Sequence, residues 1–184
     1  MQQTYTLAAL YPYATQMTPG EWAFQGEVGY NFKRHTALGG KYGTNVKVNF
    51  SNIRAIYQHV DDLNDGELMG TDGYKAHFPV YFREVNVQIE KKVSKPLKLN
   101  FMYSYQRYNQ KVVEGHGYDA IKSHIFIAEG KYQFSPKVTL RGEAQYLHTR
   151  QDQKDWWFGL LELSVLPNFM FTVSDQFNAH VPMH

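Results

Sequence analysis

The chain contains no cysteine, which removes disulfide bonds, thiolate metal sites and cysteine nucleophiles from consideration. Long apolar runs are missing as well. Mean hydropathy is −0.51, and no stretch approaches the roughly 18 consecutive apolar residues that a membrane-spanning helix needs. Neither sign of charge dominates, because 19 Lys and Arg stand against 17 Asp and Glu for a net charge of +2. An α-helical membrane protein is therefore excluded, and no nucleic-acid partner is expected.

Aromatic residues, by contrast, are abundant at 16% of the chain, and they follow an alternating pattern. In residues 21–32 the even positions are apolar or aromatic and the odd positions are mostly polar, as Trp22 and Phe24 beside Gln25 and Glu27 illustrate. A period of two is typical of a half-buried strand, whereas a helix would mix the two kinds of residue on one face. The same alternation predicts strands over residues 37–51, 84–93, 97–106, 126–134, 138–146, 157–165 and 169–177. We identify no helix. A change of phase near Asn52 indicates either a β-bulge or the end of the membrane-embedded part of the strand.

The connections between these strands alternate in length. Short turns are predicted at residues 33–36, 94–96, 135–137 and 166–168, and longer loops at 58–79, 113–120 and 149–155. This alternation is typical of up-and-down outer-membrane barrels, whose short turns face the periplasm. The predicted fold is all-β, a transmembrane antiparallel up-and-down β-barrel with about eight strands in this chain. Residues 1–20 would be a loop or the end of a preceding strand, 21–177 the barrel strands, and 178–184 the start of a loop.

Charges of both signs occupy the polar face of the predicted strands. In a membrane barrel this face lines a hydrated interior, whereas in a soluble lipocalin-like barrel it would face outside water. Glycines on the apolar face, such as Gly130 and Gly142, would leave a soluble core poorly filled but fit against fluid lipid. We therefore favour the membrane barrel. The predicted lumen-facing charged residues are Glu27, Lys47, Glu84, Glu90, Lys98, Glu129, Lys131, Arg141, Glu143 and Glu162.

Aromatic side chains gather near the predicted strand ends. Two such bands are typical of the two lipid–water interfaces, because an aromatic ring has an apolar body and a polar edge. The predicted interface aromatics are Tyr30, Phe32, Phe134 and Phe169 near the short turns, and Trp22, Tyr57, Tyr81, Tyr146, Trp156 and Trp157 near the long loops.

The first predicted strand begins, at residue 21, on the side of the long loops, and the last predicted strand ends, at residue 177, on the same side. Outer-membrane barrels ordinarily keep both termini in the periplasm, so one more strand before residue 21 and one after residue 177 would restore the usual topology. We therefore expect this chain to form part of a larger barrel. Residues 1–20 show no charged segment before an apolar core, so an export signal is expected outside this chain or already removed.

Three segments resemble a family of Bacteroidota-type outer-membrane β-barrels of unknown function. They are Tyr11–Gln16 (YPYATQ), Ala37–Ser51 (ALGGKYGTNVKVNFS) and Glu84–Gly115, which begins EVNVQIEKK. The resemblance covers most of the chain but consists of strand and turn motifs. It implies an export signal and further strands beyond both ends of this chain, and it implies no substrate and no functional residues.

Candidate catalytic and metal-binding residues are few. Ser123 and His124 are adjacent in a strand, so their side chains point to opposite faces and cannot form a nucleophile–base pair. The eight histidines fall in loops or near strand ends, and we read them as exposed residues rather than metal ligands. In the acidic loop at residues 59–73, Asp61, Asp65 and Asp72 are weak candidates for calcium ligands, although a solvated loop explains them better.

These observations predict a protein of the bacterial outer membrane that is not an enzyme and needs no cofactor. The preferred function is a porin-like channel for small solutes. The alternative is a non-conducting barrel subunit of a secretion or uptake assembly, and a soluble lipid carrier or a lipid-modifying barrel enzyme comes after it. The expected partners are outer-membrane lipid and lipopolysaccharide, and other outer-membrane or periplasmic proteins.

Overall fold

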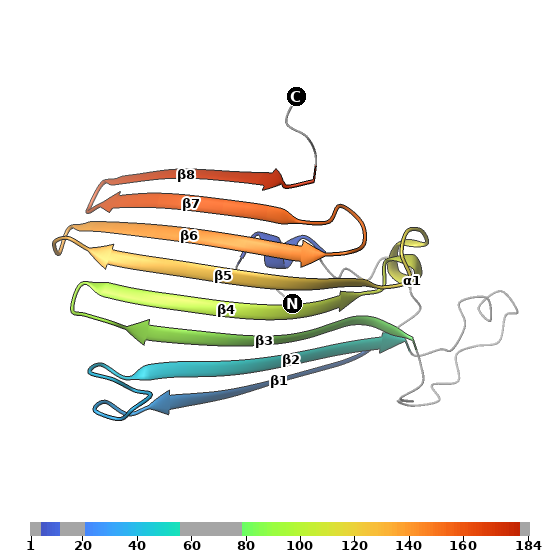
Figure 1. Ribbon diagram of the computed structural model, residues 1–184, viewed down its shortest axis with the longest axis horizontal. Coiled ribbons are helices and arrows are strands. Elements are labelled where there is room, and N and C mark those ends of the chain that lie inside the picture. The colour runs from blue at the N-terminus through green and yellow to red at the C-terminus, as the bar shows by residue number, and fades with distance from the viewer. Residues whose placement is uncertain (1–4, 12–20, 56–78, 181–184) are drawn as a thin grey trace, which may run out of the picture.

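The computed structural model describes residues 5–11, 21–55 and 79–180. These residues form one antiparallel sheet in which each strand pairs with the next along the chain (Figure 1). The strands are β1 (Glu21–Phe32), β2 (Thr44–Ala55), β3 (Val80–Lys92), β4 (Leu97–Tyr108), β5 (Ile121–Gln133), β6 (Val138–Thr149), β7 (Trp156–Val165) and β8 (Phe169–Asn178). The predicted all-β, up-and-down architecture is confirmed. The sheet is not closed: within the described ranges, β1 and β8 each pair on one side only.

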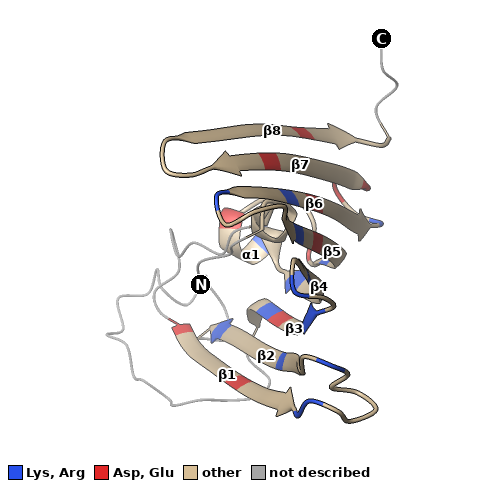
Figure 2. Cartoon of the chain, turned by 90° about the vertical axis from the view of Figure 1, so that its left-hand side faces the viewer, with Lys and Arg blue, Asp and Glu red and all other residues tan. Residues whose placement is uncertain are grey.

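The sheet is curved, and the first described segment of the chain lies on its concave side. Figure 2, which looks along the strands, shows the eight strands as an arc. The N-terminal segment, residues 5–11, carries the 3-10 helix η1 (Leu7–Ala9) and packs against this side of the arc. We call the face that it covers the inward face, and the opposite, convex one the outward face.

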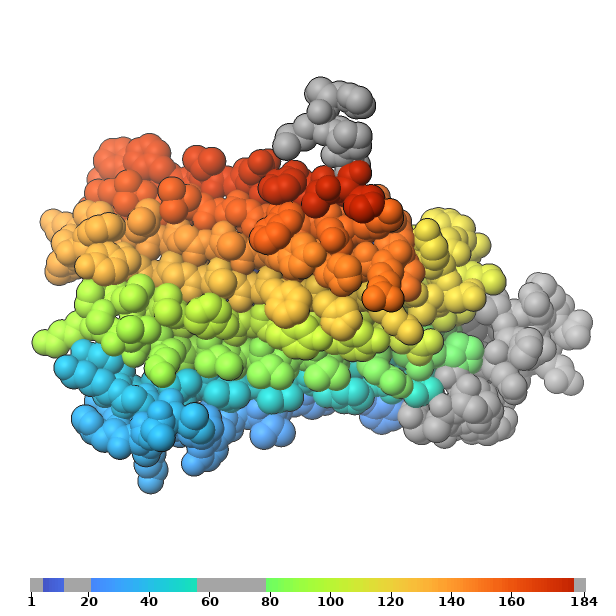
Figure 3. Space-filling model, in the orientation of Figure 1, coloured from blue at the N-terminus to red at the C-terminus, as the bar shows by residue number. Residues whose placement is uncertain are grey.

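Strand register assigns each side chain to one of these faces, because directly paired residues of an antiparallel sheet point the same way. Trp22, Val28 and Tyr30 of β1 lie outward together with their partners in β2, and the outward positions of β3 to β8 follow in the same phase. Figure 3 shows this outward face. Among its strongly exposed side chains are Val28, Tyr30, Phe50, Phe101, Phe126, Trp157, Leu161, Phe169, Phe171 and Val173.

The inward face has two parts, which strict alternation did not predict. Near the long loops it is apolar: Ile121, Ile125 and Leu147 are completely buried there beneath Leu7 of η1. Toward the short turns it carries most of its charged residues, whereas Glu84 is buried nearer the long loops. The core of the protein therefore lies between the sheet and the N-terminal segment, where apolar burial stabilises both.

Two predicted local structures were wrong. The first connection runs from residue 33 to 43, and β2 begins at Thr44 rather than at 37. His35, Gly40 and Gly43 all adopt positive φ angles, which a strand does not accommodate. A helix also exists in the second long loop, α1 (Gln110–Glu114), where the Asn109 side chain accepts a hydrogen bond from the Val112 amide and Gly115 ends the helix at φ 76°.

A bulge is present beside the end of β2, but its extra residue, Tyr81, belongs to β3, and β2 keeps an unbroken register with β1. The register between β2 and β3 shifts between Ile53 and Arg54, and Ile53 pairs with Phe82 on the inward side. Among the described residues, no helix is long and apolar enough to cross a membrane.

Candidate functional site

The ten charged residues predicted to face the interior all lie on the inward face by strand register. Most of them are close to an opposite charge. Lys98 Nζ lies 3.1 Å from a carboxylate oxygen of Glu90, and Lys47 Nζ lies 4.0 Å from Glu27. The concave side of the sheet therefore holds a mixed-charge surface.

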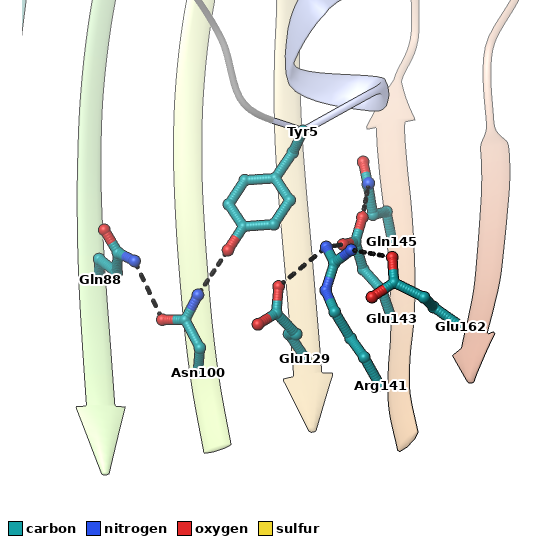
Figure 4. A network of polar contacts seen from close by, with 8 residues as sticks. All are labelled: Tyr5, Gln88, Asn100, Glu129, Arg141, Glu143, Gln145 and Glu162. Carbon is teal, nitrogen blue, oxygen red and sulfur yellow. Dashed lines mark hydrogen bonds and ion pairs between the residues drawn. The ribbon is translucent and has the colours of Figure 1, made fainter. Parts of the chain in front are cut away.

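The densest group surrounds Arg141 near the middle of β6. Its guanidinium nitrogens lie 3.1 Å from Glu129 and 3.7 Å from Glu162, and they also contact Glu143. Register explains the gathering: Glu162 is directly opposite Arg141 in β7, while Glu129 and Glu143 face one another across β5 and β6. Three carboxylates around one guanidinium leave this cluster with a local excess of negative charge (Figure 4).

Hydrogen bonds connect this cluster to the N-terminal segment. Gln145 donates to Glu143 and, through Oε1, accepts a 2.8 Å hydrogen bond from the Leu7 amide. Gln106 Nε2 donates to the Ala8 carbonyl at 2.9 Å. The segment is thus held over the inward face of the sheet by polar contacts as well as by apolar burial.

Two tyrosines anchor the ends of the same segment. The Tyr5 hydroxyl accepts a hydrogen bond from Asn100 of β4, whose side-chain oxygen in turn accepts one from Gln88. Figure 4 shows the Tyr5 side chain extending from the N-terminal segment toward Asn100. The Tyr11 hydroxyl donates to Asp152 at 3.0 Å. Burial, together with the charges of Glu129 and Glu143, raises the pKa of Tyr5 to about 12. Burial and the neighbouring Asp152 likewise raise the pKa of Tyr11.

Glu84 differs from the other predicted lumen residues because it is completely buried. It accepts hydrogen bonds from Ser104 at 2.8 Å and from Asn86 at 3.3 Å. It therefore belongs to the packed part of the inward face and does not line an open interior.

The predicted interface aromatics fall into three groups. Seven lie at outward positions or extend that face into a turn, and their rings pair at both strand ends, as with Tyr30 and Phe32 at 4.8 Å and Tyr146 and Trp157 at 4.5 Å. Tyr57 lies outside the described residues.

The assignments of Tyr81 and Trp156 to the outward surface were wrong. Tyr81 sits at the bulge, is only 2% exposed and belongs to the core. Trp156 alternates with Trp157, so it turns inward and packs against the core. An extra residue at a bulge and the period of two explain these differences.

The structure also pairs two histidines that the sequence analysis treated separately. His124 and His148 are directly opposite across β5 and β6, with ring centroids 6.5 Å apart. His148 Nδ1 lies 2.8 Å from Asp155, and His124 Nδ1 lies 2.8 Å from the Tyr103 hydroxyl. Since the two histidines are far apart in the chain, no local spacing could have revealed them. Within the described parts of the chain no group of three or more metal-ligating side chains converges, and Asp61, Asp65 and Asp72 lie outside those parts.

A family model matches residues 1–183, almost the whole chain, and its description is a family of unknown function, DUF6029. The chain belongs to DUF6029. No curated protein and no solved structure matches it. The geometry of this DUF6029 chain therefore has to carry the functional argument by itself.

Proposed function

We propose that this DUF6029 chain contributes the strands of an outer-membrane β-barrel that passes small solutes in the manner of a porin. In this proposal the outward face meets lipid, and the inward face lines a water-filled lumen that residues 5–11 narrow. The single observation that carries the proposal is the difference between the two faces: exposed aromatic and aliphatic side chains cover most of the convex side, and most charged side chains of the strands lie on the concave side. The outward charges are Lys91, Asp175 and a few basic residues near the long loops.

This arrangement is the reverse of that in a soluble carrier. A lipocalin-like barrel directs its apolar side chains toward the concave interior and its charges toward outside water. Here Phe101, Phe126 and Leu161 are each about half exposed on the convex side, while Arg141 and its three glutamates lie on the concave side. Exposed aromatic and aliphatic side chains on strands across the whole sheet form an apolar surface larger than the patches that soluble monomers tolerate.

Strand length and the position of the aromatic bands agree with a bilayer. The strands have 10 to 13 residues, and a tilted transmembrane strand needs about 9–11. Phe126 of β5 is level with the band residues Tyr146 and Trp157, and Phe134 of the other band directly follows β5. From Phe126 to Phe134 the chain advances about 26 Å at the usual rise per residue. Because an unpaired strand edge is not tolerated in hydrocarbon, the proposal includes pairing of the free edges of β1 and β8 with further strands.

A non-conducting barrel subunit is the second candidate, and one observation favours it. The N-terminal segment covers the inward face near the long loops, and Leu7 and Ala8 are buried against it. If this segment fills the lumen of the complete barrel, the protein would serve as an anchored component of an assembly rather than a pore.

Conductance of the complete barrel that contains this chain, purified and inserted in planar lipid bilayers, distinguishes the two candidates. The porin-like function predicts discrete current steps, and R141Q should shift the reversal potential toward stronger cation selectivity, because the variant removes a positive charge from the lumen. K122Q removes a positive charge from the outward face and should leave the selectivity unchanged. Inserted protein without current steps would contradict the pore and favour the second candidate.

A further inference from the structure

A row of positive charges crosses the outward face near the long loops. Arg83 of β3 is directly opposite Arg107 of β4, which is directly opposite Lys122 of β5. Directly opposed residues have Cβ atoms about 5 Å apart, and like charges in this position destabilise a sheet. An anion that bridges the row would remove this cost.

Acidic side chains of the described residues do not supply that anion. Asp119 pairs with Lys111 at 3.1 Å, and Asp155 is engaged by His148 and Tyr146. No carboxylate of the described ranges lies within ion-pair distance of the row. Arg83 contacts the neutral side chain of Asn52 at 3.3 Å.

An apolar depression of about 490 Å³ lies on the same face, closer to the middle of the strands. Its floor consists of small residues, Ala128 and Ala144, which are directly opposite one another. Four rings form the rim toward the long loops, and they occupy the next outward row: Tyr103, Phe126, Tyr146 and Trp157. Its volume is within the usual range of ligand pockets, and its lining is almost entirely apolar.

The charged row and the depression are aligned along the strands. Four residues separate Lys122 from Phe126 in β5, which corresponds to about 13 Å at the usual rise. Between them lies the row of Tyr105, His124 and His148. A ligand that fits both features has an anionic head at one end and a hydrocarbon chain at the other.

We propose that this combined surface binds one phosphorylated membrane lipid, with its phosphate at Arg107 and Lys122 and an acyl chain in the depression over Ala128 and Ala144. Arginine and lysine are the usual partners of lipid phosphates, and arginine can bind two phosphate oxygens at once. The site deepens the proposed function and depends on it, since it requires the outward face to be in a bilayer.

Quenching of Trp157 by brominated lipid tests this site. The chain has three tryptophans, so the full chain carrying W22F and W156F retains only the one at the depression. It would be reconstituted in phosphatidylcholine vesicles that contain a small fraction of chain-brominated phosphatidic acid or, for comparison, chain-brominated phosphatidylcholine. Each basic residue near an anionic lipid contributes about a fivefold preference, so phosphatidic acid should quench much more strongly at equal content.

Two variants locate the site. R107Q/K122Q should lower the preference for phosphatidic acid by about fivefold for each charge removed, and A128L/A144L should lower quenching by filling the depression. K98Q/K131Q is the matched control, because these lysines are also directly opposite one another but lie on the inward face. It should behave like the parent.

Equal quenching by the two brominated lipids, or an unchanged preference in R107Q/K122Q, would overturn the lipid site while leaving the membrane barrel intact. Absence of quenching by either lipid would overturn the proposed function together with this site. The outcomes thus separate failure of the site from failure of the membrane assignment.

Discussion

Arg141 shows how one side chain organises a surface that the sequence presents as scattered charges. Glu129, Glu143 and Glu162 belong to three different strands, and only the register of the sheet brings them to the same guanidinium. Alternation along each strand assigned all four to the polar face, and the register places them together on the concave side. It could not predict that they converge, because convergence depends on pairing between strands. The link from Gln145 to the N-terminal segment was also unpredictable, since that segment shows no periodic pattern.

Removal of the positive charge of Arg141 should therefore destabilise the inward face. We expect R141Q to lower the free energy of unfolding by about 2 kcal/mol, less than the roughly 3–5 kcal/mol for a fully buried pair, since 27% of the arginine side chain is exposed. The double variant R141Q/E143Q should recover part of the lost free energy of unfolding. Denaturant unfolding in micelles, followed by tryptophan fluorescence, measures both. K98Q removes an exposed ion pair and should cost no more than about 1 kcal/mol; an equal loss in K98Q would contradict a special role for Arg141.

Tyr5 predicts a pH dependence for docking of the N-terminal segment. Its pKa is raised from 10.0 to about 12 in the folded protein, so folding favours the neutral phenol. The stabilisation is complete below pH 10 and is lost as the pH rises from 10 through 12. NMR of tyrosine labelled with ¹³C at Cζ, with Y5F to assign the resonance, should show this phenol titrating near pH 12. Titration at the unperturbed value would show that Tyr5 is not docked.

Strand β5 illustrates which parts of an element the sequence could predict. Its second half, from Ala128, alternates cleanly, and the strand was predicted from Phe126 with the correct phase. Its first half was missed, because Ile121, Ile125 and Ile127 are apolar on the inward face, against the pattern of a hydrated lumen. These isoleucines are buried only where the N-terminal segment covers them, more than a hundred residues away in the chain. The alternation of residues within β5 cannot show that a segment distant in the chain covers part of the strand.

The outward face of the strands predicts a depth-dependent response to charge. Leu161, in the middle of β7, and Phe134, beside the short turn after β5, are both largely exposed. In a bilayer L161R should cost about 2–4 kcal/mol, whereas F134R near the interface should cost about 0–1 kcal/mol. Denaturant unfolding from phospholipid vesicles measures the difference. Two small and equal costs would place this face in water and contradict the membrane assignment.

At the scale of the whole molecule, the two faces of the sheet differ from one another, and so do its two ends. The concave side of the arc carries most of the strand charges and the convex side is mainly apolar. Three of the four connections at one end of the strands are short, the exception being residues 33–43, and the connections at the other end are longer on average (Figure 1). The short connections are residues 93–96, 134–137 and 166–168. In outer-membrane barrels the short turns face the periplasm and the long loops face the outside. If the sheet spans a membrane as proposed, this asymmetry predicts that residues 93–96 face the periplasm and residues 150–155 face the outside.

Single cysteines test this orientation directly, since the natural chain has none. Gln153 is exposed in the long connection between β6 and β7, and Lys95 is exposed in the short turn between β3 and β4. In intact cells that express the full chain, a polymer-coupled maleimide too large to cross the outer membrane should label Q153C and not K95C. Permeabilising the outer membrane should make K95C reactive as well.

Labelling of K95C alone in intact cells would require the reverse orientation. Equal labelling of both would mean that the sheet does not separate two compartments, because only a spanning sheet places its two ends on opposite sides of a barrier.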